Sequence, residues 1–269
     1  MASTETTKLL DELRDQILRE HALIHHPFMK AAIAGELTPE QVRGFVRDFW
    51  VIPHSHLINN AGKLAHAQLL RGPFSQQLLC SPYDKGITEL LGESLADELG
   101  KTEISPVSHY DPYIDLATEV GIPENEIGNV AYLSPQAVIV MYTWTQTALN
   151  FSLLELLSSH NFVHDTANVV AYPPFCEALK RHYGLSSKAV RWFDLHGEVD
   201  KEHGSRARDI LERLVRTEDD RQVARSCVRL GLGVFWCLLD GVMDRYVRGE
   251  YPTDAQGGQT PKRPTVAVA

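Results

Sequence analysis

Residues 192–203 read Trp192-Phe193-Asp194-Leu195-His196-Gly197-Glu198-Val199-Asp200-Lys201-Glu202-His203. At about 100° per residue, His196, Asp200 and His203 fall within roughly 60° of one another on a helical wheel. The same face carries Trp192 and Val199, whereas the opposite face is charged. The segment therefore predicts an amphipathic helix whose core-facing stripe contains two imidazoles and a carboxylate.

Burial of these three polar groups is costly unless each of them has a partner. One interpretation is that hydrogen bonds to other core side chains satisfy them, and for a single inward histidine we would prefer it. Three such groups on one otherwise apolar face favour a transition metal, because neutral imidazole and carboxylate are its common protein ligands.

The rest of the chain predicts more helices and almost no strands, since no alternating Val/Ile/Thr run with hairpin-type turns occurs. The expected helices cover about 7–24, 39–70, 84–99, 135–159, 173–183, 187–214 and 218–248. The helix at 135–159 is apolar almost all round and is expected at the centre of the bundle. We expect one all-α domain of about seven or eight helices over residues 1–251. The Pro/Gly-rich segment 252–269 is expected to be a disordered tail.

Composition narrows the class of protein. The 269 residues carry a formal net charge of −9, which argues against nucleic-acid binding. The sequence contains no run of 18 apolar residues, so no membrane span is predicted, and the N-terminus does not resemble a secretory signal. Four cysteines without a CxxC pair indicate a reduced, cytoplasmic protein, with Cys176 and Cys227 in buried, structural positions.

A metal would need ligands from other helices. In the helix at 84–99, Glu98 shares the face of Ile87 and Leu91, whereas Glu89 and Glu93 point to the opposite side and resemble surface charge. His109 follows after a break in the helical pattern. From spacing alone, His109 is either a ligand or an ordinary loop residue.

Other histidines give weaker indications. His21, His25 and His26 are interpreted as a solvated helix end. His54 and His56 point apart on one helix, so at most one of them faces a central cavity. Arg206 is expected to form a helix-surface ion pair, although it lies nearer the inward side of its helix.

Two segments together resemble a known family: Glu93–Gly100 (ESLADELG), followed by His109, and Phe193–Gly204 (FDLHGEVDKEHG). They are similar to the haem-oxygenase-like di-metal oxidases, which bind two non-haem irons. The resemblance covers most of residues 10–245 and implies a haem-oxygenase-like helical bundle. It also implies the metal ligands Glu98, His109, His196, Asp200 and His203.

The family pattern includes a second glutamate about 55 residues after the His109 segment, but this chain has Val163-His164-Asp165-Thr166 there. We take Asp165 as the sixth ligand because it keeps a carboxylate. His164 and the off-register Glu155 are the alternatives.

The resemblance also implies a function. Two Fe(II) ions, or Mn in their place, would use O2 as co-substrate to oxidise a small metabolite that carries a carboxylate or an amine. Oxidative C–C cleavage, N-oxygenation and desaturation are the expected outcomes in a biosynthetic enzyme. An external electron donor and a homodimer are further expectations. The alternatives are a metal-free thiaminase-II-like or pyrroloquinoline-quinone-synthase-like enzyme, or a non-catalytic binding protein, on the same fold.

Overall fold

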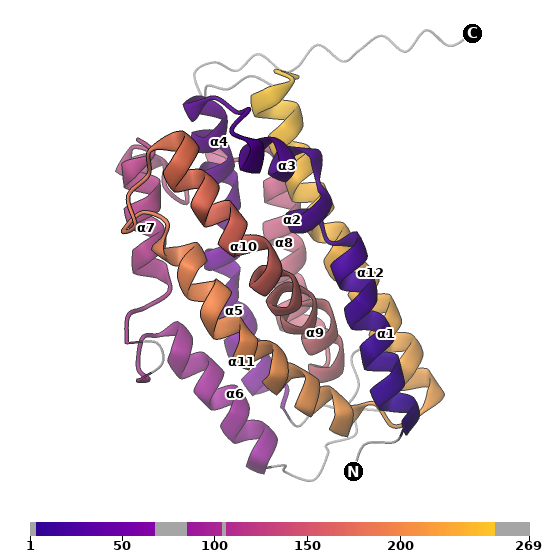
Figure 1. The fold of residues 1–269 in the computed structure, drawn as a ribbon. Helices are drawn as coiled ribbons and strands as arrows, with labels where there is room; N and C mark the ends of the chain where they lie inside the picture. Colours follow the sequence, from indigo (N-terminus) through magenta and orange to yellow (C-terminus); the bar gives the residue numbers. More distant parts are fainter. Residues whose placement is uncertain (1–3, 68–84, 104–105, 251–269) are drawn as a thin grey trace, which may run out of the picture.

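The computed structural model describes residues 4–67, 85–103 and 106–250, and within these ranges all the regular elements are helices, with no strand (Figure 1). The predicted all-α class is therefore confirmed, and the predicted tail at 252–269 lies outside the described residues. The α-helices are α1 (Thr4–Glu20), α2 (Ala22–His25), α3 (Pro27–Ala34), α4 (Pro39–Phe49), α5 (Val51–Ala65), α6 (Lys85–Glu98), α7 (Tyr110–Glu119), α8 (Pro135–Asn150), α9 (Leu153–Ser159), α10 (Asn161–Tyr183), α11 (Arg191–Leu214) and α12 (Glu218–Val242). The structure also has short 3-10 helices at Glu124–Glu126 and Val130–Tyr132 and a short π-helix at Met243–Val247.

Several predicted helices are divided by local breaks. The helix expected to run past Pro53 is interrupted at Trp50, between α4 and α5. Pro53 has no N–H to donate to the carbonyl of Phe49, so the helical ladder loses a bond at this point. The long helix expected at 135–159 breaks before Ser152, whose side chain forms a capping box with Glu155 and starts α9.

His21, His25 and His26 were predicted to form a solvated helix end, and this prediction is wrong for two of them. His21 and His26 are fully buried. The Nδ1 atom of each ring accepts a hydrogen bond from the backbone N–H two residues later, so each histidine is the N-cap of a short helix. Local capping, rather than the dipole of the preceding helix, explains their positions.

The prediction that a helix begins at Pro173 is also wrong. Pro173 and Pro174 lie in the interior of α10, which begins at Asn161. The two prolines leave the carbonyls of Val169 and Val170 without helical donors. Val170 is 49% exposed, so this part of the helix lies at the surface, where water can hydrogen-bond to such carbonyls.

Helix α8 is not buried on all sides as its composition predicted. It packs against α5 and α12, but Ile139, Tyr142 and Leu149 are more than half exposed. Its contact with α5 is close: a Cβ on Gly62 would lie 2.5 Å from the carbonyl oxygen of Ala148. Only glycine therefore lets the two backbones approach at this position.

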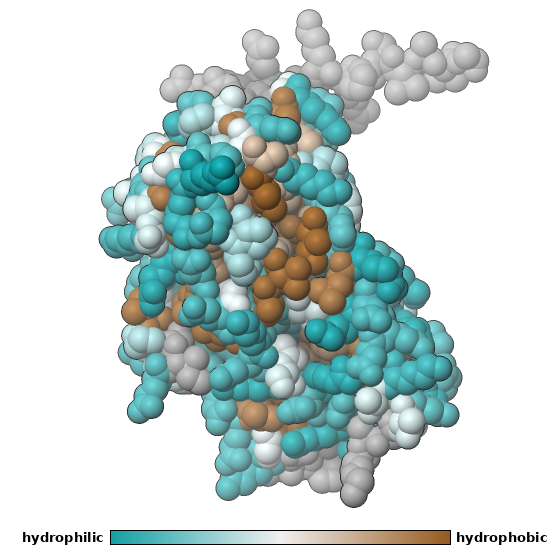
Figure 2. Space-filling model, viewed as in Figure 1, coloured by the Kyte–Doolittle hydropathy of each residue, from teal (hydrophilic) through white to brown (hydrophobic). Residues whose placement is uncertain are grey.

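The apolar core has two parts, and α11 passes from one to the other. Trp192 and Phe193 belong to the first, with aromatic residues of α4, α10 and α12, and Ala207 and Ile210 belong to the second. The metal-ligand motif of α11 lies between these two stretches of the helix. On the face of the molecule in Figure 2 the surface is mostly hydrophilic, with hydrophobic residues gathered near the centre.

One helical stretch, Glu218–Val247, is long and apolar enough to cross a membrane. More than half of its most apolar window is buried inside the bundle, as in the core helix of a globular protein. In Figure 1 it lies beside α1 along one edge of the molecule.

Candidate metal centre

Helix α11 places its three predicted ligands on one buried face. His196, Asp200 and His203 are each at most 5% exposed. The long neighbouring helix α10 packs along α11 and contributes Asp165, which is 5% exposed. Glu98 at the end of α6 and His109 at the start of α7 are also buried. All six predicted residues thus lie in the interior of the bundle.

One group of ligand candidates, the histidine cluster, consists of His56, Glu98, His109 and His196. The carboxylate of Glu98 lies at its centre: its Oε2 is 2.9 Å from Nδ1 of His109, and its Oε1 is 3.8 Å from Nδ1 of His56. One ligand atom each from His56, Glu98 and His196 all lie within 4.8 Å of one another. Burial alone would raise the pKa of Glu98, but neighbouring histidines, His109 above all, hold it below its ordinary value.

The orientation of His196 suits a metal ligand. Its Nδ1–H can donate to the carbonyl of Trp192 at 2.7 Å, which leaves the lone pair on Nε2. That Nε2 is buried and has no hydrogen-bond partner among the described residues. Burial, together with the charge of His109, lowers the pKa of His196 to about 4. A neutral ring with an unsatisfied buried nitrogen is what a metal ion would complete.

A second group, the aspartate cluster, consists of Asp97, Asp165, Asp200 and His203. The two nitrogens of His203 face two carboxylates: Nε2 is 3.1 Å from Asp97 Oδ2, and Nδ1 is 3.5 Å from Asp200 Oδ1. Burial would lower the pKa of this imidazole, but hydrogen bonds to Asp200 and Asp97 raise it to about 10. Without a metal, His203 is therefore a protonated, ion-paired residue at neutral pH.

Asp97 was not among the predicted site residues, yet it is buried and supports His203. Its Oδ2 also accepts from Arg206 at 2.8 Å, and its Oδ1 accepts from Thr102. The expected helix-surface ion pair of Arg206 is also present, with Glu202 at 3.4 Å, so the inward contact with Asp97 adds to it. A carboxylate that holds one nitrogen of a histidine, leaving the other for a metal, is a common arrangement around metal ligands.

Asp165 and Asp200 are held by asparagines of α10. Asn161 donates to Asp165 at 3.0 Å, and Asn168 donates to Asp200 at 2.8 Å. Burial and the nearby charge of Asp200 raise the pKa of Asp165 well above its ordinary value. For Asp200, burial is outweighed by the hydrogen bond with His203, and the pKa is lowered. The two carboxylates therefore differ in how readily they lose a proton.

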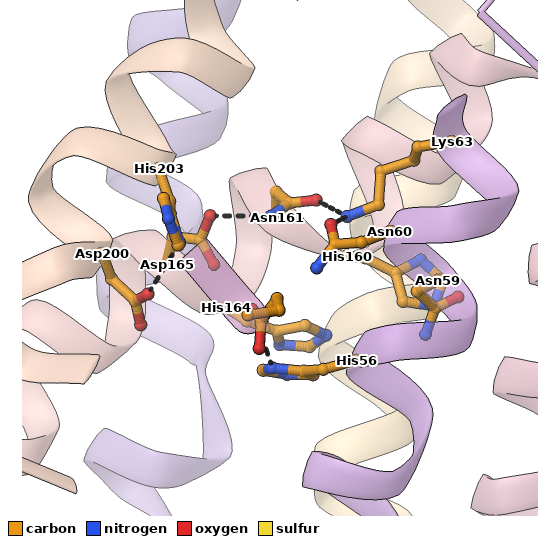
Figure 3. Close-up of a pocket in the computed structure, with 11 residues that line it drawn as sticks. His56, Asn59, Asn60, Lys63, His160, Asn161, His164, Asp165, Asp200 and His203 are labelled. Atoms are coloured by element: carbon orange, nitrogen blue, oxygen red, sulfur yellow. Dashed lines mark hydrogen bonds and ion pairs between the residues drawn. The ribbon is translucent and has the colours of Figure 1, made fainter. Parts of the chain in front are cut away.

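A cavity of about 20 Å³ opens beside these groups, room for about one water molecule (Figure 3). Its described lining residues come from four helices: His56, Asn59, Asn60, Lys63, Glu98, His160, Asn161, His164, Asp165, Asp200 and His203. Four of them lie on α5 with the spacing i, i+3, i+4, i+7. That polar stripe, visible in the sequence, is the pattern that could have identified His56 as the inward histidine of its pair.

The two alternatives to Asp165 have different positions. Glu155 uses its carboxylate in the capping box of α9, accepting from the backbone N–H of Ser152 at 2.7 Å and from its hydroxyl at 2.6 Å. His164 lines the cavity, and neither of its ring nitrogens has a hydrogen-bond partner among the described residues. Of the two, only His164 lies at the cavity.

The donor set fits iron. Imidazole nitrogens and carboxylate oxygens come together from α5, α6, α7, α10 and α11, and one of the buried nitrogens, His196 Nε2, has no hydrogen-bond partner among the described residues. Such mixed nitrogen and oxygen ligands are typical of non-haem iron.

Comparison with known proteins gives the class to which this chain belongs. Residues 75–234 match the family of iron-containing redox enzymes with a haem-oxygenase-like fold, and the chain belongs to this family. A curated relative, the 4-aminobenzoate synthase of Chlamydia pneumoniae, is 21% identical over 237 residues, which are 87% of this chain and 94% of that protein.

Solved structures share the fold at low sequence identity. A TenA homologue from Pseudomonas syringae superposes with a TM-score of 0.70 and 14% identity, covering 90% of this chain and 94% of its own. A domain with a heme oxygenase-like fold from Shewanella denitrificans gives a TM-score of 0.69 and 12% identity, with 95% and 98% covered. These similarities confirm the predicted haem-oxygenase-like architecture.

Proposed function

We propose that this protein is a non-haem diiron enzyme that uses O2 to oxidise a small metabolite. The observation that carries the proposal is the buried Glu98 carboxylate, surrounded by His56, His109 and His196, with Asp200 and His203 on the next turns of α11. Membership of the iron-containing redox family supports the choice of metal.

Each cluster would hold one iron. Glu98, His109 and His196 would bind the first, with His56 as an additional nitrogen donor. Asp165, Asp200 and His203 would bind the second. Bound Fe(II) supplies the electrons that reduce O2.

The protein's own groups orient and surround this centre. The Trp192 carbonyl fixes the tautomer of His196, and Asp97, held by Arg206, fixes the ring of His203. Trp192 packs against His196 with ring centroids 4.1 Å apart, and Trp144 packs against the cavity-lining His160 and His164 at 5.2 and 5.0 Å.

The substrate class that we propose is a small molecule with a carboxylate or an amine, oxidised by C–C cleavage, N-oxygenation or desaturation. The Chlamydia relative is named for a product, 4-aminobenzoate, that carries both groups.

Metal content and O2 consumption test the proposal. The chain is loaded anaerobically with Fe(II), desalted and assayed for iron. O2 uptake with a reductant and candidate acids and amines is then followed. We expect about two irons per chain and iron-dependent O2 uptake. A protein that retains no iron after loading would overturn the proposal.

A thiaminase-type hydrolase is the second candidate, because of the TenA-like fold. Such an enzyme would need an activated cysteine. Burial raises the pKa of the Cys176, Cys227 and Cys237 thiols, and none of the three lines the described cavity. Thiamine hydrolysis by metal-free protein would decide for this alternative.

A further inference from the structure

A buried lysine faces the ligand carboxylates across the cavity. Lys63 on α5 is 3% exposed and is the only lysine or arginine among the described residues that line the cavity. Its ammonium donates to the amide oxygens of Asn60, at 2.5 Å, and Asn161 (Figure 3). Both asparagines are neutral, so no direct ion pair among the described residues offsets the charge of Lys63.

The amide of Asn161 separates this lysine from the nearest carboxylate. Its oxygen accepts from Lys63 while its nitrogen donates to Asp165 at 3.0 Å. Burial lowers the pKa of Lys63, and the charges of Asp165 and Glu98 oppose this, leaving it at about 8. At neutral pH the group is mainly a cation, turned toward the cavity rather than to solvent.

A second polar group near the lysine has unused hydrogen-bonding capacity. Asn59 is 2% exposed and lines the same cavity, and neither atom of its amide has a partner among the described residues. A buried amide without partners is costly unless a ligand completes it. Asn59 lies one helical turn from Lys63, on the same stripe of α5.

The charge balance of the loaded site favours an anion. Two Fe(II) ions bring four positive charges, and the three ligand carboxylates Glu98, Asp165 and Asp200 offset three of them. Asp97 is paired with Arg206, so it adds no compensation, and Lys63 adds one more positive charge. An ammonium group brought into this cavity would meet a net positive field, whereas a carboxylate would be attracted.

We propose that Lys63, with Asn59 beside it, is the anion-binding subsite of this cavity and selects substrates through a carboxylate rather than through an amine. The inference rests on the proposed function and deepens it, because the choice between the two substrate classes is made by a group outside the metal ligands. The amide N–H of Asn59 would donate to the carboxylate while Lys63 supplies the charge.

Formate is the test probe, since it is the smallest carboxylate, and methylammonium is its cationic counterpart. Both are titrated calorimetrically into anaerobic Fe(II)-loaded protein. Lys63→Met keeps the side-chain length and removes the charge, and Lys85→Met, at an exposed position of α6, is the matched control. We expect formate to bind wild type and Lys85→Met equally and Lys63→Met at least about tenfold more weakly, with iron content unchanged in all three.

Equal formate affinity in Lys63→Met and wild type would overturn the proposal, as would stronger binding of methylammonium than of formate. The comparison of formate with methylammonium uses wild type alone, so it tests the proposal even if Lys63→Met fails to fold. Failure of the proposed function has a different result: wild type then retains no iron. Formate titration of the metal-free protein and of Lys63→Met would still show whether Lys63 binds anions.

Discussion

The histidine cluster and the aspartate cluster receive residues from successive turns of α11, yet without metal their ligand groups differ in protonation. In the histidine cluster Glu98 is ionised, and the pKa values of His56 and His196 are lowered by burial. In the aspartate cluster His203 holds a proton between two carboxylates, and the pKa of Asp165 is raised. In the first cluster the buried Nε2 of His196 has no hydrogen-bond partner among the described residues, whereas in the second cluster both ring nitrogens of His203 face carboxylates.

This difference indicates that two clusters with similar ligand types can have different affinities for a metal ion. A metal ion entering the histidine cluster meets an ionised carboxylate at Glu98 and two imidazoles, His56 and His196, whose pKa values burial has lowered. A metal entering the aspartate cluster must displace the proton of His203 and, where it is protonated, that of Asp165, so its binding free energy is reduced. We therefore expect the two irons to bind in order, the histidine cluster first.

The largest expected effect is on the first cluster. His196→Ala removes a buried nitrogen that has no hydrogen-bond partner among the described residues. We expect iron to fall below about one per chain after Fe(II) loading, since only the weaker aspartate cluster remains. Iron is measured on desalted protein, with circular dichroism to check the fold. His182→Ala, at an exposed position, is the control and should load like wild type. Wild-type iron in His196→Ala would show that the clusters are wrongly assigned.

The second-largest expected effect is a difference between the two clusters in how Fe(II) binding depends on pH. His203 has a pKa of about 10, so a metal that binds through it releases a proton at pH 7. Second-metal affinity should rise by one to two decades per pH unit from about pH 6 to 8, since one or two protons are released. First-metal affinity should change far less over this range, because the pKa values of Glu98, His56 and His196 are all lowered. Anaerobic Fe(II) titrations across this range check both slopes, and parallel slopes would remove the distinction.

Asp165→Ala should lower iron from about two per chain towards one while the fold stays intact. Aspartate is one methylene shorter than the family's glutamate, so we expect it to reach only the second iron. Asp209→Ala, at an exposed position of α11, is the control. If Asp165→Ala keeps both irons and His164→Ala loses one, the sixth ligand is the neighbouring histidine. Glu155→Ala completes the set and, as a capping residue, should change stability rather than iron content.

The smallest expected effect is that of Asp97→Asn, which leaves all ligands in place but weakens the hold on His203. We expect second-metal affinity to fall about 10- to 100-fold, as for other outer-shell partners of ligands, with the first metal unchanged. Competition with a chelator measures both affinities. Glu93→Gln removes only the exposed, 3.7 Å partner of Arg206 and should leave both values at the wild-type level.

The sequence by itself determined what local periodicity encodes. The spacing of His196, Asp200 and His203 among apolar residues of one helix predicted a buried polar face, and the structure buries all three. Glu98 was distinguished from Glu89 and Glu93 by the same helical geometry. The all-α class followed from capping residues and apolar spacing, which act within a few residues of one another.

Only the tertiary structure decided which polar residues of separate helices meet. Asp97 lies beside Glu98 in the sequence, and no pattern within its own helix indicates a role for it. The packing of α11 against α6 brings His203 and Arg206 to its carboxylate. Lys63 and His56 depend in the same way on the packing of α5 against its neighbours. Helical periodicity gives the face of each residue on its own helix. The rotation and axial position of one helix against another arise from packing between residues far apart in the chain, which no local pattern encodes.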